Sequence, residues 1–166
     1  MKILVLGIGN LVMSDDGIGV RVVQLIAERY RFPRHVTVLD GGTLGLDLLP
    51  SIENAQRLLI VDAVETGAAP GTLVRLSGEE IPLTLETKLS PHQMGLKDLL
   101  TVASLLDYAP VETVLWGVQP ESIEMALLLS APVQAQLEPL AGKVLEELAA
   151  WGVFPEGAQS EGLQAM

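Results

Sequence analysis

A glycine-rich stretch at residues 7–19, with the sequence GIGNLVMSDDGIG, constrains the fold of this chain more than any other feature. It follows an almost wholly apolar run at residues 2–6, which is typical of a buried parallel strand. It precedes residues 20–30, where the spacing of apolar side chains predicts an amphipathic helix. The stretch is therefore expected to be a strand-to-helix crossing at the carboxyl edge of an open α/β sheet, where ligands bind.

Two adjacent carboxylates, Asp15 and Asp16, lie at the mouth of that predicted helix. The helix dipole favours negative charge at this place. One interpretation is that Ser14 or Asp15 caps the helix and that Asp16 only occupies its first turn. The other is that Asp16 has a chemical role, which gains support because further polar groups follow other predicted strands.

The composition excludes several classes of function. A length of 166 residues with 49% hydrophobic residues suits one domain with its own core. The net charge of −11 argues against a nucleic-acid partner, because neutralising phosphates requires Lys and Arg. The absence of cysteine excludes a thiol nucleophile, a thiolate metal site and disulfides. Any metal would have to be held by carboxylate and imidazole groups.

The chain shows no targeting or membrane-spanning pattern. It passes from Met1 straight into a predicted strand, and its apolar runs are too short to cross a bilayer. We expect a cytoplasmic protein without a membrane partner, acting as a monomer. Residues 1–154 are predicted to form a single α/β domain, and residues 155–166, with their Gly, Gln, Ser and Glu, a mobile tail.

The rest of the chain predicts further elements of an α/β sheet. Residues 72–76 alternate as a strand does, and their short connection from the preceding strand makes them antiparallel to it, since a parallel crossover needs about a dozen residues. Residues 77–88 are expected to form a loop over the crevice. The other predicted elements are strands at residues 36–39, 57–61 and 114–118, a short helix at residues 44–49 ending near Pro50, and a long closing helix at residues 131–151 with Val133, Leu137, Leu140, Val144 and Leu148 in the core.

Asp40, at the end of the second predicted strand, raises the question of a nucleotide site, because an acid there can hold a ribose. The glycine pattern supports this poorly. Gly7 and Gly9 match the first two positions of G-x-G-x-x-G, but Val12 occupies the third, and no G-x-x-x-x-G-K-[ST] exists in the chain.

Asp62 follows the strand predicted at residues 57–61. If that strand lies beside the first strand, Asp62 faces the same crevice as Asp16, at a topological switch point. The alternative is that Asp62 only caps the turn that follows.

The sequence SPHQMGL at residues 90–96 predicts a helix start. Ser90 fits the N-cap, Pro91 the first helical position, and Gln93 completes a capping box. His92 is then fixed in the first turn, where the helix dipole disfavours imidazolium and leaves a neutral ring able to bind metal. A purely structural histidine is the alternative; the only other histidine, His35, is expected at the surface.

Five blocks of residues together resemble one family, the hydrogenase maturation proteases. They are residues 7–10 with 14–19, 40–43, 61–63, 90–96 and 117–122, and the resemblance runs from about residue 1 to residue 151. It implies a three-layer α/β/α sandwich whose mostly parallel twisted sheet has about five strands, one of them antiparallel. It also implies an endopeptidase that removes the carboxyl-terminal extension of a nickel–iron hydrogenase large-subunit precursor after nickel insertion.

The same resemblance implies that Asp16, Asp62 and His92 are the catalytic and metal-contacting residues; some relatives carry Glu at the first position. Two carboxylates and an imidazole suit nickel, zinc or cadmium, with coordination positions left open. The nickel is expected to be contacted in the loaded precursor rather than held permanently, although other divalent metals could substitute in vitro. Cleavage through a metal-polarised carbonyl or metal-activated water and cleavage through a carboxylate general base both remain open.

Two other functions remain as alternatives. A non-catalytic nickel-binding checkpoint protein would keep the same three ligands but cut nothing. A peptidyl-tRNA hydrolase-like enzyme would share the opening strand and G-x-G-N turn, but its polyanionic substrate requires a basic face that this chain lacks.

Overall fold

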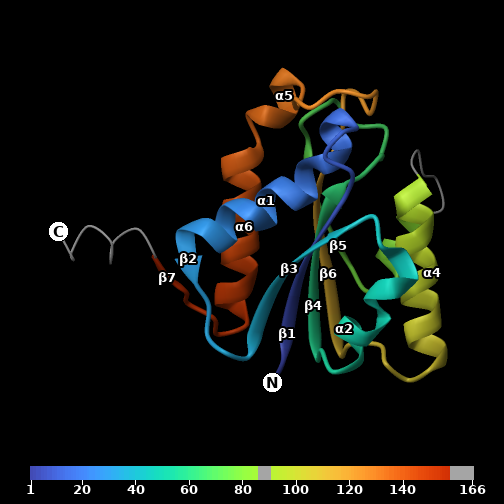
Figure 1. Cartoon of the computed structure of the whole chain (residues 1–166), viewed down its shortest axis with the longest axis vertical. Coiled ribbons are helices and arrows are strands. Elements are labelled where there is room, and N and C mark those ends of the chain that lie inside the picture. The colour runs from blue at the N-terminus through green and yellow to red at the C-terminus, as the bar shows by residue number, and fades with distance from the viewer. Residues whose placement is uncertain (86–90, 158–166) are drawn as a thin grey trace.

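The computed structural model describes residues 1–85 and 91–157, with the backbone alone for residues 85 and 91–94. Five strands form one sheet in the order β3-β1-β4-β6-β5, as Figure 1 shows. Neighbouring strands are parallel except for β5, which runs antiparallel to β6 at the edge. The strands are β1 (Ile3–Ile8), β3 (Val36–Gly42), β4 (Arg57–Ala63), β5 (Leu73–Ser77) and β6 (Glu112–Val118).

Helices cover both faces of this sheet, so the predicted three-layer α/β/α fold is confirmed (Figure 1). Helices α1 and α6 lie on one face, and α2 and α4 on the other. The helices are η1 (Ser14–Gly17), α1 (Ile18–Arg29), η2 (Gly45–Leu48), α2 (Leu49–Glu53), α3 (Glu80–Leu85), α4 (Pro91–Leu105), α5 (Ala131–Gln134) and α6 (Leu137–Ala150). None of those in the described part of the chain has the length and apolar character needed to span a membrane.

The position of β4 in the middle of the sheet explains why its residues 58–61 are continuously apolar. Successive side chains of a strand point to opposite faces of the sheet. Leu59 and Val61 accordingly pack in the core under α1 and α6, whereas Leu58 and Ile60 pack in the core under α2 and α4. Because both faces are covered, no position along the strand can be polar without a specific partner.

The edge strand and the helix after β3 differ in detail from their predictions. Strand β5 is antiparallel as expected, but it pairs with β6 because β6 takes the place beside β4. The helix predicted at residues 44–49 continues instead as α2 to Glu53, with Pro50 in its first turn. Proline is tolerated there because its missing N–H would have no partner within the helix.

The loop predicted at residues 77–88 contains α3, so that prediction was wrong for residues 80–85, while residues 86–88 lie outside the described part. Glu80 starts this helix by accepting hydrogen bonds from the Ser77 amide at 3.0 Å and hydroxyl at 3.1 Å. A capping carboxylate three residues after a serine is a helix start signal that the sequence contained.

The closing helix predicted at residues 131–151 is two helices, α5 and α6. Pro139 explains the break, because a proline ring inside a continuous helix clashes with the carbonyl four residues earlier. The predicted core face is nonetheless confirmed: Val133, Leu140, Val144 and Leu148 are buried, and Leu137 is partly buried.

The end of the described chain lies beside the segment that follows α1. Two short strands, β2 (Tyr30–Arg31) and β7 (Glu156–Gly157), pair antiparallel beside the main sheet. Residues 158–166 lie outside the described part, so the mobile tail at residues 155–166 stays a prediction.

Candidate active site

Two glycines allow the strand-to-helix crossing to pack tightly against the sheet. Gly9 has a φ of +141°, and a Cβ there would lie 1.9 Å from the Asp16 carbonyl oxygen. A Cβ at Gly19 would lie 2.0 Å from the carbonyl oxygen of Val61 in β4. The crossing therefore needs glycine at both positions, and it lies against the end of β4.

Asp16 lies within this crossing, in the 3-10 helix η1 that leads into α1. Its side chain is buried, with 3% of the residue exposed. The Asn10 amide donates a hydrogen bond to Asp16 Oδ2 at 3.1 Å, so the carboxylate also fixes the turn that follows β1. Asp16 is therefore held from both ends of the crossing rather than displayed on a solvated first helical turn.

Asp62 lies next to the end of β4 and is fully buried. The Ala63 amide donates to its Oδ1 at 2.8 Å. Since alternate residues of a strand share a face, Asp62 lies on the same side as Leu58 and Ile60, toward the layer of α2 and α4. Strand β4 lies directly beside β1, as the sequence interpretation required, so Asp62 and the crossing that contains Asp16 meet at one sheet edge.

His92 lies in the first turn of α4, which begins at Pro91 as predicted. Figure 1 shows that α4 begins at the end of the molecule toward which the parallel strands run. One turn later, α4 packs closely against the segment after β3, because a Cβ at Gly95 would lie only 3.3 Å from the Cα of Gly45. Ser90 and the side chains of His92 and Gln93 lie outside the described part, so the capping box and the role of His92 stay predictions.

The described side chains alone include no group of three His, Asp, Glu or Cys residues arranged to hold a metal. The predicted set needs His92, whose side chain is outside that part of the structure. The fold thus brings Asp16 and Asp62 to the carboxyl edge of the sheet, and α4 begins at the same end of the molecule; the set of Asp16, Asp62 and His92 stays a prediction.

Asp15 has a role that sequence reasoning missed. It is fully buried, and its carboxylate accepts four hydrogen bonds from the segment between β6 and α5. The donors are the amides of Glu121 at 2.9 Å, Ser122 at 3.0 Å and Ser130 at 2.8 Å, and the Ser130 hydroxyl at 2.7 Å. Asp15 therefore anchors a loop and is not a helix cap.

Ser14 does not cap α1 either. Its hydroxyl donates to the backbone carbonyl of Glu124, in the same loop that Asp15 holds. Neither η1 nor α1 has a side-chain cap in this structure. Both residues thus fasten the crossing to a loop more than a hundred residues later in the chain.

Gln119, directly after β6, is a second residue whose role was not predicted. It is buried, and its Oε1 accepts a hydrogen bond from the Thr66 amide at 2.8 Å. Its Nε2 donates to Glu65 Oε2 at 2.6 Å. Gln119 therefore ties the loop after β4 to the loop after β6; a polar residue directly after a buried strand was the available signal.

Asp40 has a structural explanation that needs no nucleotide. Its carboxylate accepts a hydrogen bond from the Gly42 amide at 3.0 Å, which closes a turn in which Gly42 has a φ of +50°. Such a hydrogen bond to the amide two residues later is the usual reason for an aspartate at a turn.

Comparisons with known proteins identify relatives of this chain. The family model described as "Hydrogenase maturation protease" matches residues 20–147. The Hydrogenase 2 maturation protease of Escherichia coli (strain K12) is 43% identical over 154 residues, covering 92% of this chain and 94% of that protein. The hydrogenase expression/formation protein HoxM of Azotobacter vinelandii is 47% identical, covering 92% of this chain and 74% of that protein.

Solved structures give the same result. The hydrogenase maturating endopeptidase HybD from E. coli superposes with a TM-score of 0.92 at 41% identity, covering 96% of this chain and 99% of that one. The [NiFe] hydrogenase maturation protease HybD from Thermococcus kodakarensis superposes with a TM-score of 0.74 at 31% identity, covering 90% and 99% of the two chains.

Proposed function

Because this chain belongs to the hydrogenase maturation protease family and is an endopeptidase, we propose that it removes the carboxyl-terminal extension of a nickel–iron hydrogenase large-subunit precursor after nickel insertion. The observation that carries the proposal is the pair of buried carboxylates, Asp16 and Asp62, where the first crossing meets the end of β4. Membership of this family leaves no support for a peptidyl-tRNA hydrolase.

The donor set suits a nickel ion that arrives within the substrate. Asp62 lies on the face of the sheet that α4 covers, and His92 is in the first turn of α4. Asp16 supplies a second carboxylate from the crossing at the same edge. Two oxygen donors and one imidazole nitrogen accept nickel and leave positions for the ligands that the precursor itself provides.

For hydrolysis, the chain must position the substrate peptide bond and supply a base. The oxygen of a water molecule bonds to the carbonyl carbon, the C–N bond breaks, and the proton goes to the leaving amine. A buried carboxylate at Asp16 or Asp62 can take the proton from water, and burial strengthens its electrostatic interactions with the reacting atoms. We propose that nickel seated between these groups aligns the precursor, so that only loaded precursor is cut.

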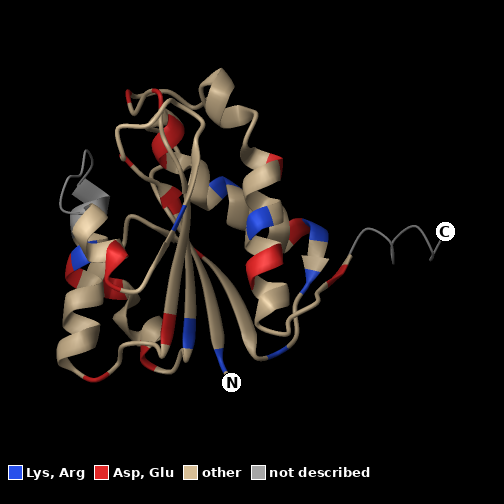
Figure 2. Ribbon diagram, turned by 180° about the vertical axis from the view of Figure 1, so that it is seen from behind, with Lys and Arg blue, Asp and Glu red and all other residues tan. Residues whose placement is uncertain are grey.

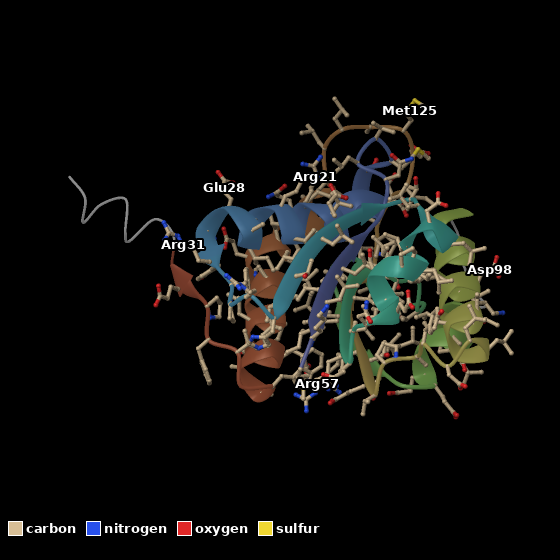
Figure 3. The ribbon with its side chains drawn as sticks, turned by 60° about the horizontal axis from the view of Figure 1, so that its bottom comes forward. Arg21, Glu28, Arg31, Arg57, Asp98 and Met125 are labelled. Carbon is tan, nitrogen blue, oxygen red and sulfur yellow. The ribbon has the colours of Figure 1, made fainter. Side chains whose placement is uncertain are left out.

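The decisive experiment compares precursor with and without nickel. Purified enzyme should shorten the loaded precursor at its carboxyl end, as measured by intact mass, and leave the nickel-free precursor unchanged. Asp62→Asn should remove the activity, whereas Asp98→Asn, at an exposed position on α4, is the matched control that should keep it (Figure 3).

Two results would contradict the proposal. Equal processing of loaded and nickel-free precursor would show that cleavage does not depend on nickel. Tight binding of loaded precursor without loss of mass would indicate a checkpoint protein instead. Within the proposal, the enzyme acts as a cytoplasmic monomer, which the size of the free protein in sedimentation would test.

A further inference from the structure

The loop at residues 119–130, here named the β6–α5 loop, carries an exposed apolar patch at the edge of the candidate site. Met125 is 81% exposed, Leu127 66% and Leu128 80%. Val12, from the facing crossing, is 45% exposed. Figure 3 shows the Met125 side chain at the outer rim of the molecule. Contiguous exposed apolar groups of this kind mark interaction sites in soluble proteins.

The backbone of this loop is held firmly, so the exposure is built into the fold. The Ala126 amide donates to the Val12 carbonyl at 3.0 Å, and the Ser14 amide donates to the Ala126 carbonyl at 2.9 Å. The Arg21 guanidinium donates to the Leu127 carbonyl. With the Asp15 carboxylate holding both ends of the loop, the backbone that carries these apolar side chains cannot move inward without breaking hydrogen bonds.

The patch is continuous with the proposed catalytic edge. Asp15, which holds the loop, is adjacent in η1 to Asp16. A protein seated on Met125, Leu127 and Leu128 therefore lies beside the crossing that contains Asp16. The patch is exposed, whereas Asp16 and Asp62 are 3% and 0% exposed, so a surface that covers the patch does not by itself contact the two carboxylates.

Charge indicates what kind of surface would cover the patch. The ionisable residues of the β6–α5 loop are Glu121 and Glu124, both exposed. Acidic residues also occupy other loops at the end of the molecule opposite the N-terminus, as Figure 2 shows. With a net charge of −11 on the whole chain, the complementary partner is an apolar surface flanked by Lys or Arg.

We propose that Met125, Leu127 and Leu128 form a docking surface for the folded body of the precursor, at an apolar, basic-flanked region outside the cleaved extension. The inference rests on the proposed function in taking a whole protein as the substrate. Docking on this loop positions the precursor over the Asp16 and Asp62 edge, and Asp15 acts as a positioning residue that keeps the loop in place.

The test uses a triple variant, Met125→Ser with Leu127→Ser and Leu128→Ser, on the full chain. The matched control replaces two equally exposed apolar residues from the other end of the sheet, Leu105→Ser and Val111→Ser, whose exposures are 79% and 89%. The triple variant should raise KM for loaded precursor by about tenfold or more and change kcat by less than about twofold. The control should leave both values unchanged.

A binding measurement separates this inference from the proposed function. In an Asp16→Asn background, which prevents cleavage during the measurement, adding the triple substitution should lower the affinity for purified precursor further, whereas adding the control substitutions should not. Equal affinities would overturn the docking surface even if cleavage is normal. Loop-dependent binding without cleavage by the wild-type enzyme would instead overturn the proposed function and support docking. If the triple substitution changes self-association in sedimentation but leaves precursor binding unchanged, the patch binds a second copy of this chain, and the inference is overturned.

Discussion

The helices on the two faces of the sheet are held in place by different interactions. On the face of α1 and α6, Glu147 of α6 accepts hydrogen bonds from Arg75 Nε at 2.7 Å and from Trp116 Nε1 at 2.8 Å. On the face of α2 and α4, the start of α4 is fixed by close backbone contact between Gly45 and Gly95. The first face is thus cross-linked by charged side chains, while the contact that positions His92 depends on small residues.

This difference predicts which substitutions should change the stability of the protein and which should change its activity. Asp62 lies on the α2 and α4 face, His92 belongs to α4, and Asp16 lies where the crossing enters the other layer. The candidate site is therefore assembled between layers, with Asp62 fixed by the sheet, Asp16 by the crossing, and His92 carried by a helix. Substitutions at the site should affect activity more than folding, and substitutions at Glu147 should do the reverse.

The largest effect is expected at Asp62. Asp62→Asn keeps the shape and the acceptor for the Ala63 amide but removes the charge, so processing of loaded precursor should fall by about 100-fold or more. The melting temperature should change little. Retention of activity in this variant would show that Asp62 is only a turn residue, as the sequence alone allowed.

At Asp16, activity should depend similarly on the negative charge but should tolerate a longer side chain. Asp16→Asn should remove most of the affinity for metal, whereas Asp16→Glu should keep processing within about tenfold because it keeps the carboxylate donor. The measurement is nickel titration together with precursor processing. If both variants behave like the wild type, Asp16 serves only to hold the Asn10 turn.

His92→Ala should abolish nickel or cadmium binding and leave the fold close to intact. The start of α4 is set by Pro91 and by the contact of Gly95 with Gly45, neither of which needs the imidazole. Metal titration with circular dichroism on the same samples gives both readouts. Unfolding of the variant would indicate a structural histidine, and unchanged affinity in a folded variant would remove it from the ligand set.

Asp15→Asn should have an intermediate effect. The asparagine side chain keeps one acceptor oxygen, but its NH2 group would face backbone N–H groups that need an acceptor. This loss should lower the free energy of unfolding by about 1–3 kcal/mol. The loosened loop should raise KM for precursor more than it lowers kcat. A fall in kcat with unchanged KM would place Asp15 in the chemistry rather than in positioning.

The sequence predicted the parts of the structure that depend on local patterns. Apolar runs located the strands, and the glycine-rich stretch located the crossing, because Gly9 and Gly19 meet backbone atoms at distances that no side chain allows. The neighbouring positions of β1 and β4 entered only as a condition for placing Asp62 near Asp16, and the structure meets that condition.

The unpredicted parts depend on contacts distant in sequence or on single residues. A local cap was one of the interpretations for Asp15, and its actual donors, at residues 121–130, could not be predicted because they are more than a hundred residues away. The break between α5 and α6 depends on Pro139 alone, and an apolar periodicity that continues across it conceals the break.

The smallest effect on activity, and a clear effect on stability, is expected for Glu147→Gln. The hydrogen bond from Arg75, followed by that from Trp116, holds the pKa of the Glu147 carboxyl below its ordinary value of 4.5. A lowered carboxyl pKa stabilises the fold above the unfolded value and loses that contribution as the pH falls through the folded value. At pH 7 the variant should therefore lose about 1–2 kcal/mol of unfolding free energy, measured by urea titration, with kcat unchanged. The deficit should shrink as the pH falls from 4.5 through the lower folded-state pKa, because protons then bind the carboxyl of the unfolded chain first and so favour unfolding of the wild type. A deficit that stays constant with pH would mean that the shape of Glu147 matters and its charge does not, and a matching loss of kcat would show that the two faces of the sheet are not independent.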